Sequence, residues 1–179
     1  MTLNDILVSA LAQLERGHDA QTMELFRARL TDYANDAQDD IARELLFSKK
    51  ETVAPSAGIV DIESLSRDCI KVEKVTQLGG EVRFRESGTG SIELPYDAPA
   101  EITYRCLPQK LASPTDEPEI PAHTHGLMVL YVVGRERMAG DVSTQRGANI
   151  YLSMYEAAKS RLRPHMGDPA GYRIINRWG

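Results

Sequence analysis

The sequence is poor in cysteine and in aromatic residues, and it has no long apolar run. Two cysteines in 179 residues are too few for a disulfide scaffold. The longest apolar run, Leu127 to Val133, has seven residues, whereas a membrane span needs about 20. The first residues carry Asp5 and no basic leader, so we expect no signal peptide and a reducing cytosol in which Cys69 and Cys106 remain thiols. With 42% hydrophobic and 26% charged residues, the composition is that of a folded globular domain.

Motifs that carry catalysis are also missing. Gly88-Thr89-Gly90 lacks the Gly-Lys-Ser/Thr ending of a phosphate-binding loop, and no Gly-x-Ser-x-Gly sequence is present. The two cysteines form no Cys-x-x-Cys pair or Cys/His group that would hold structural zinc. Asp36, Asp39 and Asp40 are interpreted as a solvated helix face. We therefore predict that the protein is not an enzyme and that it binds no cofactor.

His123 and His125 are the best candidates for metal ligands. Two histidines at i and i+2 converge in an extended segment, whereas on a helix they diverge by about 200°. Because Pro121 lies just upstream, we expect them in the first turn of a helix, satisfying its free N–H groups or packing at its end. We predict no metal site, and a soluble metal-dependent enzyme that uses this pair is kept as an alternative.

Helical periodicity marks the start of the chain. Apolar residues recur at helical spacing from Leu3 to Leu14, and Thr2 with Asp5 resembles a capping box for that helix. A second apolar stripe runs from Met23 to Leu45. The charged face opposite to it is expected to face water or a neighbouring subunit.

The periodicity then changes from 3.6 to 2. We interpret residues 49–58 as a connection and predict four or five short antiparallel strands between Val60 and Cys106, with hairpin turns at Gly79-Gly80 and Gly88-Thr89-Gly90. Residues 109–121 hold three prolines and three acids, which predicts a rigid acidic loop.

Helix returns after this loop. The pattern predicts a buried helix from about Leu127 to Gly140 and an amphipathic helix from about Ser143 to Arg163, with Ser143 or Thr144 as N-cap. The predicted fold class is therefore α+β, with a helical base of two N-terminal and two C-terminal helices, an inserted antiparallel β region and an extended C-terminal arm. The predicted boundaries are 1–48 and 122–166 for the base, 49–121 for the insertion with its acidic loop, and 167–179 for the arm.

Charge is distributed unevenly along the chain. The net charge is -3 over residues 1–50, -6 over 51–121 and +4 over 122–179. Such a dipolar chain can align like subunits head to tail or meet a partner of opposite charge, or it can simply present solvated faces of different sign.

The last residues are unusually apolar and basic for a chain end. They include Tyr172, Arg173, Ile174, Ile175, Arg177 and Trp178. Tryptophan and arginine are enriched at binding hot spots. Two interpretations are open: the segment folds back over the core of its own domain with Trp178 as a plug, or it is an arm that docks on another chain.

The order of several short motifs resembles a known family. These are the first helix LNDILVSAL, an N-x-A-x-x-x-I passage at Asn35, Ala37 and Ile41, a strand-rich insertion, a strand end with Tyr104, Leu107 and Pro108, the loop TDEPEIP, the helix GLMVLYVVGRERMAGD, a helix with Tyr151 and Tyr155-Glu156, and a terminal Trp178. Together they resemble the head-to-tail connector, or adaptor, proteins of tailed bacteriophages.

The resemblance implies a structural virion protein, assembled in the host bacterial cytoplasm and located at the head–tail interface. It implies a ring of twelve copies between the portal protein and the tail or neck proteins, with double-stranded DNA passing through the lumen without specific binding and with no membrane contact. It also implies that the terminal segment named above docks on the portal. A tail terminator or stopper-type virion protein is the alternative, which a helix content well below a third would favour.

Overall fold

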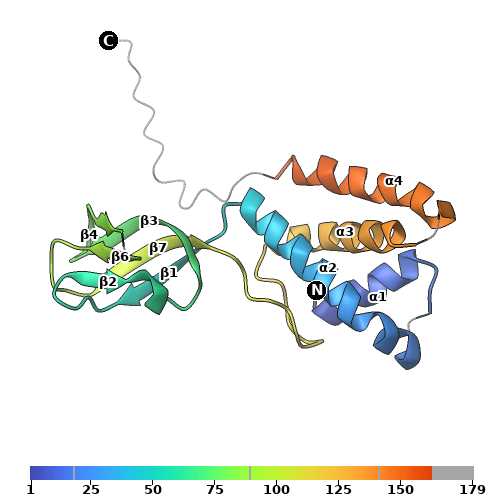
Figure 1. Ribbon diagram of the computed structural model, residues 1–179, viewed down its shortest axis with the longest axis horizontal. Helices are drawn as coiled ribbons and strands as arrows, with labels where there is room; N and C mark the ends of the chain where they lie inside the picture. Colours follow the sequence, from blue (N-terminus) through green and yellow to red (C-terminus); the bar gives the residue numbers. More distant parts are fainter. Residues whose placement is uncertain (18, 89, 141, 163–179) are drawn as a thin grey trace, which may run out of the picture.

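The structure, a computed structural model, describes residues 1–17, 19–88, 90–140 and 142–162. Within them the chain forms four α-helices and two antiparallel sheets, so the predicted α+β class is confirmed. The helices lie together in one half of the molecule and the strands in the other (Figure 1). The helices are α1 (Leu3–Gln13), α2 (Ala20–Glu44), α3 (His125–Met138) and α4 (Val142–Lys159), with short 3-10 turns at Ile62–Ser64 and Ala122–Thr124.

The helical half forms because each helix buries an apolar face against α3. Helix α3 packs against α1 and α2 and, most extensively, against α4 (Figure 1). The predicted burial of this apolar helix is confirmed, since Met128, Val132 and Val133 are inaccessible to solvent. Gly134 allows α4 to approach closely, because a Cβ atom there would lie 2.7 Å from Cδ2 of Leu152.

Local signals begin the first two helices where the sequence places them. The predicted capping box of α1 is present: the amide of Asp5 donates to Oγ1 of Thr2 at 3.2 Å, and the amide of Thr2 donates to the Asp5 carboxylate at 2.9 Å. Asp19 caps α2 by accepting the amides of Gln21 and Thr22. Helix α4 begins at Val142, so the prediction of Ser143 or Thr144 as its N-cap is wrong, because both lie inside its first turn.

The β half contains more strands than predicted. Seven strands are present in the described residues, instead of four or five, and they form sheets of order β1-β7-β3-β4 and β2-β6-β5. They are β1 (Ser48–Val53), β2 (Ile59–Asp61), β3 (Cys69–Gln77), β4 (Gly80–Val82), β5 (Arg85–Ser87), β6 (Ser91–Glu93) and β7 (Ala100–Cys106). Both sheets contribute to one apolar cluster, which includes Val60, Val75, Ile92 and Ile102.

Strand β1 corrects the sequence prediction. Residues 48–53, most of them assigned to a connection, form edge strand β1, which pairs with β7 from Ser48↔Arg105 to Val53↔Ala100. None of its residues is fully buried, so it carries no strong hydrophobic alternation. The chain also changes sheet between β4 and β5, because β4 pairs with β3 whereas β5 pairs with β6 of the other sheet.

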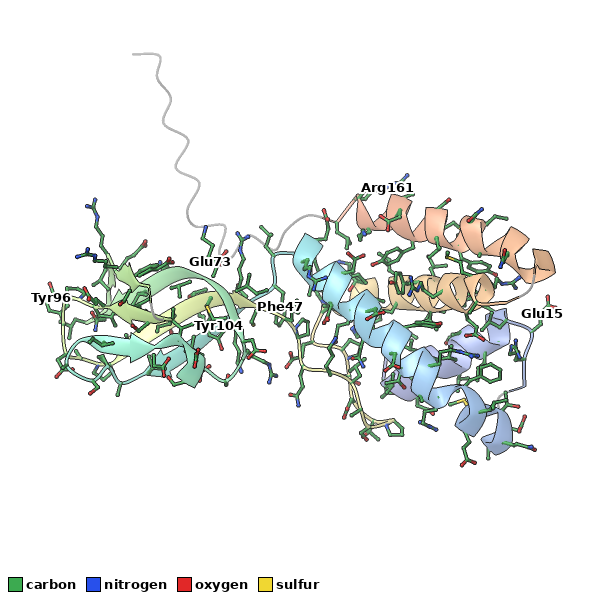
Figure 2. All side chains as sticks on the ribbon, viewed as in Figure 1. Glu15, Phe47, Glu73, Tyr96, Tyr104 and Arg161 are labelled. Carbon is green, nitrogen blue, oxygen red and sulfur yellow. The ribbon has the colours of Figure 1, made fainter. Side chains whose placement is uncertain are left out.

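Phe47 lies between the two halves (Figure 2). Its side chain packs against the helical cluster and against the β cluster. The two apolar cores therefore meet at the residue that follows α2 and precedes β1.

Candidate assembly surfaces

The acidic loop, residues 109–121, is fastened to α2 by two buried amide side chains. Asn35 donates to the carbonyl of Leu111 at 3.0 Å and accepts the Leu111 amide at 2.7 Å, so it pairs with this backbone as a neighbouring strand would. Gln38, which is fully buried, donates to the carbonyl of Gln109 at 2.9 Å and accepts the amide of Glu119 at 3.2 Å. Polar groups of an irregular segment are thus satisfied inside the protein, as buried backbone requires.

The same loop completes the start of α1. The amides of Leu3 and Asn4 donate to the carbonyls of Asp116 and Pro114, at 2.7 and 3.0 Å. These are donors that a helix cannot satisfy within its own first turn. The Asp116 carboxylate accepts the amides of Ala112 and Ser113, and these bonds lower its pKa. The loop is a folded part of the helical half and not a free surface segment.

Contacts between the loop and the β half are fewer and more exposed. Arg67, which precedes β3, donates to the side chains of Gln109 and Glu119 at 3.0 and 2.9 Å. The side chains of Arg67 and Glu119 remain 23% and 37% exposed. An ion pair of this kind contributes about 1 kcal/mol or less.

The helix face that was interpreted as solvated is engaged at two of its three carboxylates, so that interpretation is wrong for Asp39 and Asp40. Asp39 is 8% exposed and pairs with Lys110 at 2.6 Å. Asp40 accepts the Tyr155 hydroxyl at 2.6 Å and the Lys159 ammonium at 2.7 Å, which joins α2 to α4. Asp36 is exposed, as predicted.

These contacts shift the titration of the groups involved. Burial alone would raise the pKa of Asp40, but the hydrogen bonds from Lys159 and Tyr155 outweigh it, so the pKa of this carboxyl is lowered. Burial and the bond to Asp40 raise the pKa of Tyr155 far above its usual value. The contact is therefore a charged network that holds α4 onto α2 at neutral pH.

A pocket of about 450 Å³ lies where α1 ends, α2 passes and α3 ends. Glu136, on its wall, is 6% exposed and pairs with Arg29 at 2.7 Å through Oε1, while Oε2 has no hydrogen-bond partner among the described residues. The guanidinium groups of Arg16 and Arg29 lie 4.5 and 5.2 Å from the centre of the Phe26 ring. Arginine side chains thus cover an aromatic ring at the mouth of the pocket.

The two histidines singled out in the sequence do not converge. His123 is exposed in the 3-10 turn before α3, whereas His125 is buried at the first residue of α3. The ring of His125 lies 3.0 Å from the carbonyl of Ile120 through Nε2 and 3.3 Å from the amino group of Met1 through Nδ1. Its position in the first turn of the helix is the one predicted. In the described part of the chain, no group of three or more His, Cys, Asp or Glu side chains is placed to hold a metal ion.

Several large apolar side chains are exposed on the helices. Leu25 of α2 is 76% exposed, and Ile150 and Met154 of α4 are 62% and 52% exposed. The sequence interpretation of α4 followed the buried face, where Ala148 and Tyr155 lie. It missed the opposite row, which the four-residue spacing of Ile150 and Met154 would have revealed.

The predicted docking arm, Tyr172, Arg173, Ile174, Ile175, Arg177 and Trp178, lies outside the described residues.

Cys69 and Cys106 are free thiols in paired positions of β3 and β7. Among the described residues, no helix has both the length and the apolar character to cross a membrane. No protein-family model matches the sequence, and no curated protein is significantly similar to it.

Proposed function

We propose that this chain is a head-to-tail connector, or adaptor, of a tailed bacteriophage. It forms a homo-oligomeric ring of twelve copies between the portal protein and the tail or neck proteins, and viral DNA passes through the ring during ejection. The four helices form the base of the ring, the β insertion reaches a neighbouring virion protein, and residues 167–179 extend to the portal. The protein is assembled in the host bacterial cytoplasm and is located in the neck of the mature virion.

The observation that carries this proposal is a contact between two of the passages on which the family resemblance rests. Gln38 belongs to the N-x-A-x-x-x-I passage and accepts the amide of Glu119, inside the loop TDEPEIP. The same passage also binds the residues just before TDEPEIP, because Asn35 pairs with Leu111 and Gln38 donates to the carbonyl of Gln109. Segments that lie about 75 residues apart in the sequence are therefore joined by hydrogen bonds in the fold. This contact supports the interpretation that the motifs belong together as one family pattern.

The charge of the chain is compatible with a DNA channel. A strongly basic lumen would bind phosphates and release counterions, so that DNA would be held instead of sliding. With a net charge of -5, the chain as a whole has no excess of cations. Only the C-terminal part, residues 122–179, is basic overall, and its net charge of +4 divides into +3 in residues 122–166 and +1 in the arm.

The test is binding of the purified full-length chain to portal rings of the phage that encodes it. We expect a complex with the portal that contains a ring of the chain, measured by native mass spectrometry and by electron microscopy. Deletion of residues 171–179 should abolish portal binding, and Lys71→Gln, which changes an exposed side chain of β3, serves as the control. Failure of the full-length chain to bind portal rings, together with normal phage assembly by the deletion variant, would refute the docking arm.

The alternatives make different predictions. The α-helices have 11, 25, 14 and 18 residues, more than a third of the chain, which weighs against a tail terminator or stopper by the criterion of helix content. A metal-dependent enzyme requires stoichiometric metal in the purified protein. Loss of such metal in His123→Ala, which changes an exposed side chain, would favour that alternative over the connector.

A further inference from the structure

Helix α4 presents an outward row that has no partner among residues 1–162 as the structure describes them. Ile150 and Met154 are more than half exposed, and Ala157 and Arg161 continue the row toward the end of the described residues. Ile150, Met154 and Ala157 follow one another at three- and four-residue steps, so they lie on one side of the helix, and Arg161 lies in the turn that follows Lys159. Tyr155, on the opposite side, is fully buried. Arg161 forms no ion pair with any described residue.

Helix α2 presents a second outward row with a complementary order of residues. It begins with Leu25, which is 76% exposed, continues through Ala28, and ends with the exposed carboxylates of Asp32 and Asp36. Neither carboxylate pairs with a cation among the described residues. The row is thus apolar at its start and acidic at its end, whereas the row on α4 is apolar at its start and basic at its end.

The two rows also match in length. Leu25 to Asp36 spans 11 residue steps of α2, which is about 16 Å at 1.5 Å per residue, and Ile150 to Arg161 spans the same number of steps, the last two of them in the turn after α4. In a parallel alignment Leu25 faces Ile150 and Asp36 faces Arg161. In an antiparallel alignment each charged end would face a large apolar side chain. Spacing and charge therefore select the parallel register.

The fold presents the two rows in a way that suits repetition. Helices α2 and α4 both start at the same end of the helical half and run in the same general direction, and α4 packs chiefly on α3 (Figure 1). A neighbour rotated by a small angle therefore brings its α2 nearly parallel to α4 of the first copy. Two different patches that meet in this way form a heterologous contact, which closes into a ring when the rotation divides a full turn.

We propose that the outward row of α4 binds the outward row of α2 in a second copy of this chain. This inference rests on the proposed ring, for which it names the contacting surfaces. Two copies joined through α2 and α2 would bring the acidic ends together in a parallel pair, which electrostatic repulsion opposes, and would place them against Leu25 in an antiparallel pair, so neither arrangement pairs a carboxylate with a cation. The contact involves one helix of each copy, whereas a stable interface buries roughly 1,000 Å² or more, so we expect association of the free chain to depend on concentration and to be strengthened by ring closure.

Disulfide trapping of the full-length chain tests the register. The double variant Leu25→Cys/Ile150→Cys should give a ladder of covalent species beyond the dimer under mild oxidation at high protein concentration. Leu25→Cys/Arg161→Cys, which places the thiols at opposite ends of the parallel register, is the matched control and should give no ladder. The wild type controls for the native thiols. An equimolar mixture of the two single variants Leu25→Cys and Ile150→Cys should stop at the dimer.

Charge reversal provides an independent measurement. Asp36→Arg and Arg161→Asp should each weaken association by about fivefold to thirtyfold in sedimentation equilibrium, since an exposed attraction becomes a repulsion of similar size. The double variant Asp36→Arg/Arg161→Asp should restore it. Both positions are exposed, so the variants are expected to fold, and circular dichroism checks that they do.

The outcomes separate this inference from the proposed function. A ladder from the register pair without portal binding would retain the α4–α2 contact and refute the connector. Portal binding by the register pair without a ladder would refute the contact and retain the connector. Covalent dimers from Ile150→Cys alone would show that the outward row of α4 binds α4 of a second copy instead of α2. A chain that stays monomeric at every concentration tested would show that the chain does not self-associate. Either result overturns the inference.

Discussion

Replacement of Asn35 by alanine is the sharpest test of how the acidic loop is held. Asn35 is 8% exposed and makes both of its hydrogen bonds with Leu111, accepting its amide and donating to its carbonyl. Leu111 is itself 4% exposed and belongs to the helical core. In Asn35→Ala, two buried backbone groups therefore lose their partner in a place that water reaches poorly.

The expected loss follows from these two bonds. A net hydrogen bond contributes about 1 kcal/mol, and a buried group left without a partner costs about 1–3 kcal/mol. For two backbone groups, with some relief from water that enters the site, we expect unfolding to become easier by roughly 2–4 kcal/mol. For a chain of this size that corresponds to a fall in Tm of roughly 5–15 °C.

The assay combines urea unfolding with amide hydrogen exchange. Asn35→Ala should lower the free energy of unfolding and increase exchange within residues 109–121, while the protection of β3 remains. Asp36→Ala changes the adjacent exposed carboxylate and is the control, expected to alter stability by less than about 0.5 kcal/mol. A loss below about 1 kcal/mol in Asn35→Ala, or unchanged exchange in the loop, would show that this amide does not hold the loop.

Two further predictions concern the attachment of α4. Gly134→Ala should destabilise the protein by about 1–3 kcal/mol in urea unfolding, because the added Cβ would lie 2.7 Å from Leu152. In a Leu152→Ala background the same substitution should cost much less. Equal stability of Gly134→Ala and the wild type would contradict the close approach of the two helices. Because the pKa of Asp40 is lowered in the folded protein, its stabilising effect is present above the unfolded value of about 3.9 and is lost as pH falls through the folded value. Asp40→Asn should therefore be less stable than the wild type at pH 7, with the gap narrowing below about pH 4, and a gap independent of pH would argue against the ion pair with Lys159.

The helices could be predicted from the sequence because their signals are local. The capping pair of Thr2 and Asp5 lies within one turn, and an apolar stripe at 3.6-residue spacing needs no knowledge of the partner that covers it. Strand β1 carried no such signal. Its residues 48–53 include Lys49, Lys50 and Glu51, and they are extended because β7 pairs with them. Pairing with a strand about 50 residues away is a tertiary effect that a single segment does not encode.

The charged face of α2 was misinterpreted for a similar reason. Asp36, Asp39 and Asp40 are adjacent on the helix and chemically equivalent in the sequence. Only the fold brings Lys110 to Asp39, and Tyr155 with Lys159 to Asp40. A carboxylate without a known partner is expected to be exposed. A carboxylate that pairs with a cation from a remote part of the sequence can instead be buried, and that partner is identified only in the folded chain.

The contacts of the loop explain how an insertion can extend a helical base without disturbing it. Buried amides tie residues 109–121 to α2, and backbone bonds tie them to α1, so the return path from the strands is part of the helical half. The partly exposed pair Arg67–Glu119 and the shared contacts of Phe47 are what join it to the β half. A neighbour that binds the β half can therefore shift it mainly at Phe47 and Arg67, where polar contacts are weak, while the outward rows of α2 and α4 keep their spacing. In the proposed ring, we therefore expect the insertion to adapt to a tail or neck protein without strain at the contacts between subunits.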